Sequence, residues 1–197
     1  MRRFALLVTL VFALPLAAQT ELGVHVAGAH AGSTDAQGTT LAFDRGRGFG
    51  ASLEHASGEH LSYELAATSL RYDAALRLDN ASANIGKLKL VPLTATARWH
   101  FAPRGESVDP YVGAGAAYVK ASDLSSANLD ALGLDRIAVE SGTCWLANAG
   151  VAFHLRSYAV VVDGKYLDYQ PSSVSAGTRV RLSLKPVVLS VGLRFKL

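Results

Sequence analysis

The chain has 197 residues, a length that suits one domain, and a formal net charge of +3. Its single cysteine, Cys144, excludes an internal disulfide. The sequence has no cluster of Lys and Arg with interleaved aromatic residues, the composition that follows phosphates in nucleic-acid-binding proteins. Nucleic acid is therefore not an expected partner.

The first 18 residues have the three-part order of a secretory signal peptide. Two arginines precede an apolar stretch over residues 4–14, which Pro15 and small residues then follow. We expect cleavage after Ala18, which would leave residues 19–197 as a single barrel domain and lower the net charge to +1. An uncleaved anchor is the alternative, and the short apolar core disfavours it.

Residues 21–30, 47–55 and 59–70 alternate between apolar and polar side chains, which predicts three β-strands. A tight turn at residues 56–58 joins the second strand to the third. The polar segments over residues 31–46 and 71–86 are predicted as long loops.

Residues 87–119 predict a hairpin. Its first run has Val91, Leu93 and Trp99 on one face and Arg98 and His100 on the other. A turn at residues 103–105 follows. Three aromatic residues beside that turn match an aromatic belt at a membrane surface: Trp99, Phe101 and Tyr111. Either alternation fits the second run, residues 109–119.

Residues 142–155, residues 158–169 and the carboxy-terminal segment predict three more strands. The connection over residues 121–141 is the longest and contains a candidate short helix at residues 128–134. In the last strand the apolar residues change parity near Pro186. Either a bulge resets the face there, or Leu182 and Leu184 point inward.

The seven predicted connections alternate strictly between long and short. This order predicts an all-β fold, an eight-stranded antiparallel transmembrane β-barrel with short periplasmic turns and long extracellular loops. In the clearest strands one face is uniformly apolar and the other carries the charges. Apolar-out and polar-in is typical of a membrane barrel, whereas a soluble lipocalin-type barrel has the reverse arrangement.

Three blocks of sequence resemble the OmpW family of small outer-membrane barrels: residues 88–101 followed by 109–119, residues 129–153, and residues 180–197. The resemblance implies an outer-membrane location and a passage for small hydrophobic molecules in the outer half of a barrel that is closed toward the periplasm. It also implies three kinds of partner: outer-membrane lipids, small hydrophobic ligands, and the barrel assembly machinery acting on the carboxy-terminal strand. The chain departs from the family by ending Phe195-Lys196-Leu197, without a terminal aromatic residue. It also has Ala149 and Ala152 where the family often has bulky aromatics.

Projecting the inward faces divides the predicted interior into two zones. Toward the periplasm lies a polar plug, which we define as Glu54, His60, Glu64, Arg98, His100, His154 and Arg194. Toward the outside lies a leucine cup, defined as Leu70, Leu88, Leu90, Leu146, Leu182 and Leu184. Ion pairing within the plug and ligand binding in the cup are the expected roles. The alternative is a structural or surface-recognition barrel filled by its own side chains, with no transport role.

No metal, cofactor or catalysis is expected. His60, His100 and His154 come from three different strands without the short spacing of metal ligands. Ser, His and Asp are present, but no motif marks a nucleophile and its base. At the predicted outer rim, Arg71, Lys87, Lys89 and Arg179 are either contacts for lipid phosphates or solvated flanking residues.

Overall fold

The computed structural model describes residues 20–36, 39–43, 45–78, 81–123, 138–175 and 178–197. The expected signal peptide and the candidate helix at residues 128–134 lie outside these ranges. Among the described residues, no helix is long and apolar enough to cross a membrane.

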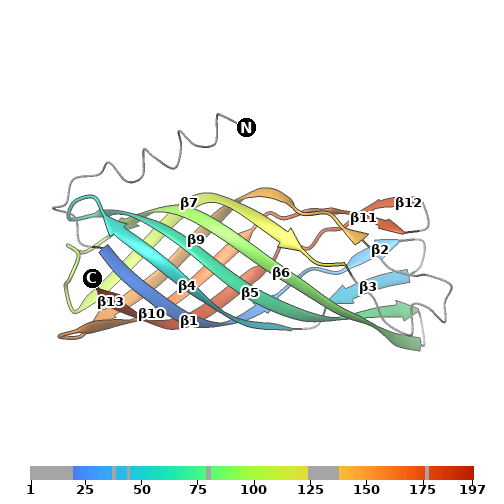
Figure 1. Ribbon diagram of the computed structural model, residues 1–197, viewed down its shortest axis with the longest axis horizontal. Helices are drawn as coiled ribbons and strands as arrows, with labels where there is room; N and C mark the ends of the chain where they lie inside the picture. Colours follow the sequence, from blue (N-terminus) through green and yellow to red (C-terminus); the bar gives the residue numbers. More distant parts are fainter. Residues whose placement is uncertain (1–19, 37–38, 44, 79–80, 124–137, 176–177) are drawn as a thin grey trace.

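Eight strands close into one barrel: β1 (Thr20–His30), β4 (Gly46–Ala56), β5 (Leu61–Leu78), β6 (Ala81–His100), β7 (Val108–Ala121), β9 (Gly142–His154), β10 (Tyr158–Leu167) and β13 (Val187–Lys196). Each strand pairs antiparallel with the next, and β1 pairs with β13, so no barrel strand is left as a free edge. Figure 1 shows the barrel lengthwise, with the carboxy terminus at its left end. The predicted eight-stranded antiparallel barrel is confirmed.

The outer surface of the wall is an apolar band. Phe49 is 70% exposed and Val26 is 66% exposed, although both are large and hydrophobic. Further exposed apolar side chains share their outward parity: Val24, Leu53, Leu65, Leu93, Trp99, Val112, Trp145, Val162, Leu189 and Val191. A continuous apolar surface of this size is the face that a membrane barrel presents to lipid.

The structure shows which residues face inward on β7 and in the segment before β13. On β7 the side chains of Val112 and Tyr118 face outward, whereas Tyr111 is 1% exposed inside the barrel. Placing Tyr111 in the aromatic belt was therefore wrong, because it lies on the inward face of its strand. Before β13, Leu182 and Leu184 are buried, as is Val188, which has the same parity. No bulge is needed at Pro186.

The strands are joined by short turns at one end of the barrel and extend much further at the other. Three short turns, at residues 57–60, 101–107 and 155–157, lie at the same end as both termini of the barrel domain. At the other end, β5 and β6 extend over 18 and 20 residues, well beyond the roughly 9–11 residues that cross a bilayer.

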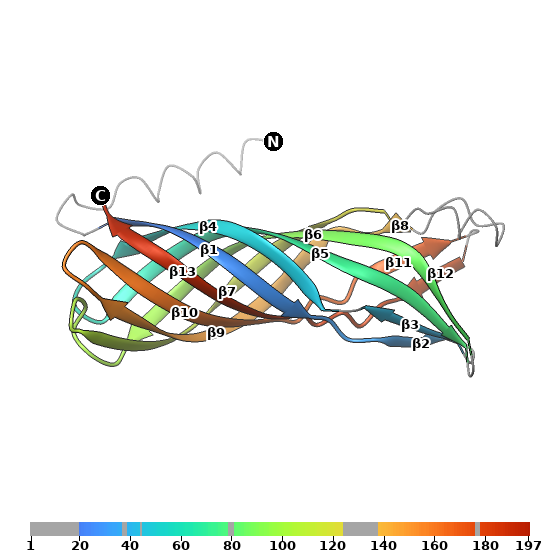
Figure 2. The same ribbon diagram turned by 90° about the horizontal axis from the view of Figure 1, so that it is seen from below.

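The segments predicted as long loops contain further strands. β2 (Thr34–Ala36) and β3 (Thr39–Phe43) extend the barrel sheet beside β5. β8 (Ala138–Val139), β11 (Ser172–Ser175) and β12 (Thr178–Arg181) form a separate three-stranded sheet. Figure 2 shows these strands and the β5–β6 hairpin projecting together at the outer end. The loop prediction for residues 71–86 was wrong, because these residues continue β5 and β6 apart from residues 79–80, which the structure does not describe.

Candidate functional site

Arg98 of β6 lies at the centre of the lower interior, by which we mean the half of the barrel interior nearest the short turns. Its guanidinium is 2.7 Å from Glu54 Oε2, 2.6 Å from Glu64 Oε2 and 3.4 Å from Asp163 Oδ2. All four side chains point inward from different strands because each occupies the inward parity of its own strand. Arg98 is 1% exposed, so its charge is held by these carboxylates and not by solvent.

Glu54 of β4 connects Arg98 to the end of the barrel that carries the short turns. Arg194 Nη2 lies 2.8 Å from Glu54 Oε2, and Arg104 Nη1 lies 3.1 Å from Glu54 Oε1. Arg104 also donates to Glu21 Oε2 at 3.2 Å. Arg104 comes from the turn between β6 and β7, so this turn folds its side chain back across the mouth of the barrel.

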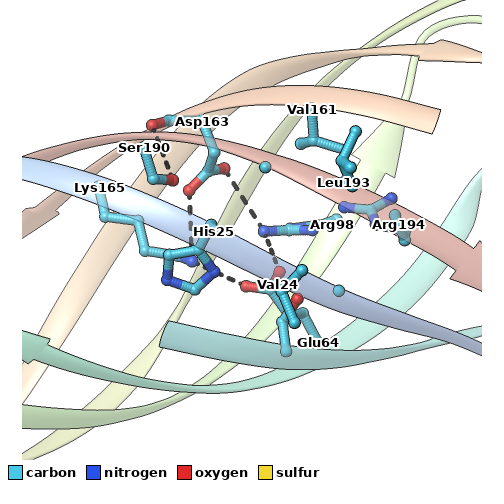
Figure 3. A pocket seen from close by; sticks show the side chains of 13 residues that line it. Val24, His25, Glu64, Arg98, Val161, Asp163, Lys165, Ser190, Leu193 and Arg194 are labelled. Carbon is cyan, nitrogen blue, oxygen red and sulfur yellow. Dashed lines mark hydrogen bonds and ion pairs between the residues drawn. The ribbon is translucent and has the colours of Figure 1, made fainter. Parts of the chain in front are cut away.

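The opposite wall contributes a second group of polar side chains. Lys165 of β10 lies 2.9 Å from Glu64 Oε1 and 3.2 Å from Asp163 Oδ1. Asp163 also accepts hydrogen bonds from the Tyr111 hydroxyl at 2.8 Å and from Asn148 Nδ2 at 2.9 Å. Figure 3 shows the side chains of Arg98, Lys165, Glu64 and Asp163 gathered around one small pocket.

We call this assembly the charge network: Glu21, Glu54, Glu64, Arg98, His100, Arg104, Asp109, Asp163, Lys165 and Arg194. It contains five of the seven residues predicted as the polar plug, and a sixth, His154, contacts it at 3.5 Å from Asp109 Oδ2. The seventh, His60, lies apart from the interior. Its ring stacks on Trp99 at 5.5 Å, and its Nδ1 is 2.8 Å from the His100 carbonyl oxygen. His60 precedes β5, which begins at Leu61, so the alternation of that strand does not determine where it points.

Ser62, His100 and Asp109 meet in the order of a catalytic triad. Ser62 Oγ is 2.8 Å from His100 Nε2, and His100 Nδ1 is 2.9 Å from Asp109 Oδ2. All three residues are fully buried, and His100 Nε2 is also 3.5 Å from Glu54 Oε1. A substrate therefore has no route to the Ser62 hydroxyl in this structure, and these residues form part of the closed floor.

The lower interior contains a small cavity of about 20 Å³, lined by His25, Glu64, Arg98, Asp163, Lys165 and neighbouring residues. A space of this size and polarity suits about one water molecule. Across the described residues, no group of three or more His, Cys, Asp or Glu side chains is arranged to hold a metal ion. The charge network leaves little free space in the half of the barrel nearest the short turns.

Glycines in the wall make room for these large side chains. A Cβ atom on Gly150 would lie 2.5 Å from the Tyr111 hydroxyl oxygen, and one on Gly113 would lie 2.3 Å from Asn148 Oδ1. An eight-stranded barrel has an interior only just wide enough for side chains. The Gly113-Ala114-Gly115 sequence thus serves packing on the inner face.

The six residues of the leucine cup lie together in one buried apolar cluster, and each is at most 2% exposed. Phe43, Tyr72, Ile85, Leu167 and Tyr169 belong to the same cluster. Burial raises the pKa of Tyr169, whose neutral hydroxyl donates to the Glu140 carbonyl oxygen at 2.6 Å. In this state the cup is filled by its own side chains.

Two irregularities lie beside the cup. The Tyr72 hydroxyl is buried and has no hydrogen-bond partner among the described residues. The register is the same at the pairs Ala67–Leu93 and Leu70–Leu90, so Thr68 faces Pro92 and Ser69 faces Val91 between them, but these two facing pairs are not joined in the β5–β6 ladder. Pro92 has no N–H to donate, which weakens the wall where the cup meets the charge network.

The sequence matches the OmpW family profile over residues 16–197. The chain belongs to the OmpW family. It is an outer-membrane β-barrel, and its short turns face the periplasm as in other barrels of this kind. No curated protein matches the sequence.

Solved structures share the fold at low sequence identity. The outer membrane protein OprG from Pseudomonas aeruginosa superposes with a TM-score of 0.81 at 15% identity, covering 92% of this chain and 96% of OprG. Neisserial surface protein A superposes with a TM-score of 0.63 at 18% identity, covering 91% and 99% of the two chains. The outer membrane protein AlkL in lipid bilayers gives 0.60 at 13% identity, covering 91% and 90%.

The sequence reasoning missed several members of the charge network. Asp163 and Lys165 share one parity in the strand predicted over residues 158–169, opposite its apolar residues, and that parity was a sufficient signal to include them. Asp109 shares the parity of Tyr111, which the sequence left ambiguous. Glu21 is the second residue of β1 and lies on the inward face of that strand. Arg104 reaches the network from a turn, where strand alternation gives no signal.

Proposed function

We propose that this barrel binds small apolar molecules in its outer half and releases them sideways into the membrane. The observation that carries the proposal is the sharp division of the interior. An apolar cluster that includes the leucine cup lies above a charge network that leaves room for about one water molecule. An apolar solute that enters the outer half cannot continue downward without separating buried ion pairs.

The weakened wall between β5 and β6 offers the exit. It lies directly below Leu70 and Leu90, the two cup residues that pair across these strands. The outward side chains at this level, Ser69 and Val91, adjoin the lipid-facing band. A solute leaving there passes from an apolar interior to hydrocarbon and avoids the charged floor.

The rival function is a structural or surface-recognition barrel with a solid interior. Its support is the close packing of the leucine cup, in which each leucine is at most 2% exposed. Binding requires the cluster to open. The segment that holds Leu182 and Leu184 lies between β12 and β13. Isolated backbone hydrogen bonds join it to its neighbours, from Gly32 to Leu184, from Leu182 to Pro171 and from Lys185 to Tyr169.

Replacing Pro92 with Ala should slow release through the wall. Alanine restores an N–H that can complete the β5–β6 ladder at the level of Thr68 and Ser69, so opening would require breaking another hydrogen bond, worth about 1 kcal/mol or a fivefold change in rate. Uptake of an apolar fluorescent probe into the bilayer of vesicles containing the barrel measures this, with empty vesicles as the baseline. Wild-type uptake equal to that of empty vesicles contradicts the proposed function, and equal uptake by wild type and Pro92→Ala contradicts the exit alone.

Replacing Tyr72 with Phe should separate two classes of ligand. A buried hydroxyl without a partner is unfavourable by about 1–3 kcal/mol, so its removal should leave stability unchanged or slightly higher. A ligand with one hydrogen-bond acceptor, such as a long-chain alcohol, should bind about fivefold more weakly to the variant, while a plain hydrocarbon should bind equally. Displacement of a fluorescent probe by each compound measures both affinities. Equal weakening of both would show that Tyr72 contributes only shape.

A further inference from the structure

Three cations lie side by side on the outer surface where the wall leaves the apolar band. Arg47 of β4 pairs directly with Arg71 of β5, and Arg71 pairs directly with Lys89 of β6. All three side chains are exposed and share the outward parity. We call Arg47, Arg71 and Lys89 the cationic row.

Three adjacent cations are unfavourable unless a counter-ion neutralises them. Directly opposed residues on neighbouring strands have Cβ atoms about 5 Å apart, and like charges at that spacing repel each other. Among the described residues, no carboxylate forms an ion pair with any member of the row. Asp73 is the acidic residue beside it on β5, and Asp73 lies 4.0 Å from Lys87.

The neighbouring strands add positive charge around the row. Lys120 of β7 is exposed and pairs with Val91, so it lies diagonal to Lys89. Arg45 is exposed just before β4. The positive surface thus extends from β4 to β7 at one level.

The height of the row matches a lipid headgroup. Lys89 lies ten positions before Trp99 on β6, and Trp99 marks the periplasmic edge of the apolar band. At about 3.3 Å per residue and a tilt of about 40°, this stretch rises roughly 25 Å, which is the height of the apolar band of such barrels. The cationic row therefore lies where the outer-leaflet hydrocarbon ends and the phosphates begin.

The opposite side of the barrel has a different chemistry at its outer end. There Trp145 packs against Tyr166 at 5.4 Å, and its Nε1 donates to Asp168 at 3.0 Å. Lys185 on that side lies 4.0 Å from the same Asp168. This aromatic and acidic surface differs from the cationic row across the barrel.

We propose that the cationic row binds the phosphate group of an outer-leaflet lipid whose acyl chains lie along the apolar band below it. Two arginine side chains can each present paired N–H donors to phosphate oxygens, and Lys89 adds a point charge. Phe49 and Val91, on the same face just below Arg47 and Lys89, would contact the acyl chains. A free anion would make the phosphate contacts but would not contact the apolar surface.

The test is equilibrium binding of bis-phosphorylated lipid A to the full-length barrel in neutral detergent micelles. The double substitution Arg71→Gln with Lys89→Gln should weaken binding about thirtyfold, because each cation near a membrane surface contributes about fivefold and the two factors multiply. The matched control, Arg156→Gln with Lys196→Gln, removes two exposed cations at the periplasmic end and should leave affinity unchanged. Heat-modifiable migration on a detergent gel checks that each variant is folded.

Two further arms identify the ligand chemistry. Dephosphorylated lipid A should bind at least tenfold more weakly than the phosphorylated form, and inorganic phosphate should compete only at concentrations far above that of the lipid. Equal affinity of both variants for lipid A, or equal binding of dephosphorylated lipid A, would overturn the proposal. Displacement by inorganic phosphate at the same concentration as the lipid would assign the row to a free anion and would overturn it as well.

Discussion

Replacing Arg98 with Met is expected to destabilise the barrel by about 3–5 kcal/mol, more than any single change outside the charge network. The substitution keeps much of the side-chain volume but leaves Glu54, Glu64 and Asp163 facing one another in a buried interior. The carboxylates would repel each other and would lose Arg98, their shared partner. Because Arg98 is 1% exposed, solvent would not replace it. Unfolding by urea from detergent micelles, followed by tryptophan fluorescence, measures the change.

Arg156→Met is the matched control for this experiment. Arg156 is exposed in the turn between β9 and β10, so the same loss of charge should change the free energy of unfolding by less than about 0.5 kcal/mol. Adding Glu64→Gln to Arg98→Met should recover part of the lost stability, because it removes one of the stranded charges. A loss for Arg98→Met no larger than that of the control would mean that the carboxylates are held mainly by Lys165, Arg104 and Arg194.

The charge network explains how a narrow barrel can be both closed and polar. Arg98, Arg104, Lys165 and Arg194 face Glu21, Glu54, Glu64, Asp109 and Asp163, and His100 bridges Asp109 to Glu54. Each carboxylate has at least one cationic or imidazole partner within 4.0 Å. This pairing offsets the large desolvation penalty of so many buried charges and leaves the lower half without an aqueous bore.

The membrane-embedded part of the fold could be predicted because lipid imposes a simple alternation. Leu93, Arg98 and Trp99 face where period-two patterning places them, and the pairing of β5 with β6 and of β6 with β7 follows from strands predicted in order. Strand β7 was ambiguous because Gly and Ala dominate both of its faces. Its inward face was determined by Tyr111, whose hydroxyl has a buried partner that sequence alone does not locate.

The outer extension was missed because its alternation is inverted. Above Leu70 and Leu90 the outward residues become charged, as Arg71, Asp73 and Lys87 show, while Tyr72 and Leu88 between them are buried. Once the wall leaves the lipid, its outer face meets water and its inner face must supply an apolar core. Interpreting residues 71–86 as a polar loop overlooked that change of solvent.

Replacing Leu90 with Asp is the functional change with the largest expected effect. Leu90 is buried in the leucine cup and pairs with Leu70 beside the weakened wall, so a carboxylate there would bring water into the apolar cluster. We expect binding of an apolar probe to weaken by at least tenfold and its uptake into vesicle bilayers to fall toward the level of empty vesicles. The charge network and the lipid-facing band are untouched, so the lower barrel should still form.

Asn84→Asp provides the control for charge at the outer end. Asn84 is exposed on the same strand, and its side-chain oxygen already accepts a hydrogen bond from the Gly86 amide at 2.9 Å, which aspartate preserves. Probe binding by Asn84→Asp should equal that of wild type, and heat-modifiable migration should be retained in both variants. If folded Leu90→Asp takes up the probe as fast as wild type, apolar molecules do not pass through the leucine cup. The packed interior would then favour the structural or surface-recognition role.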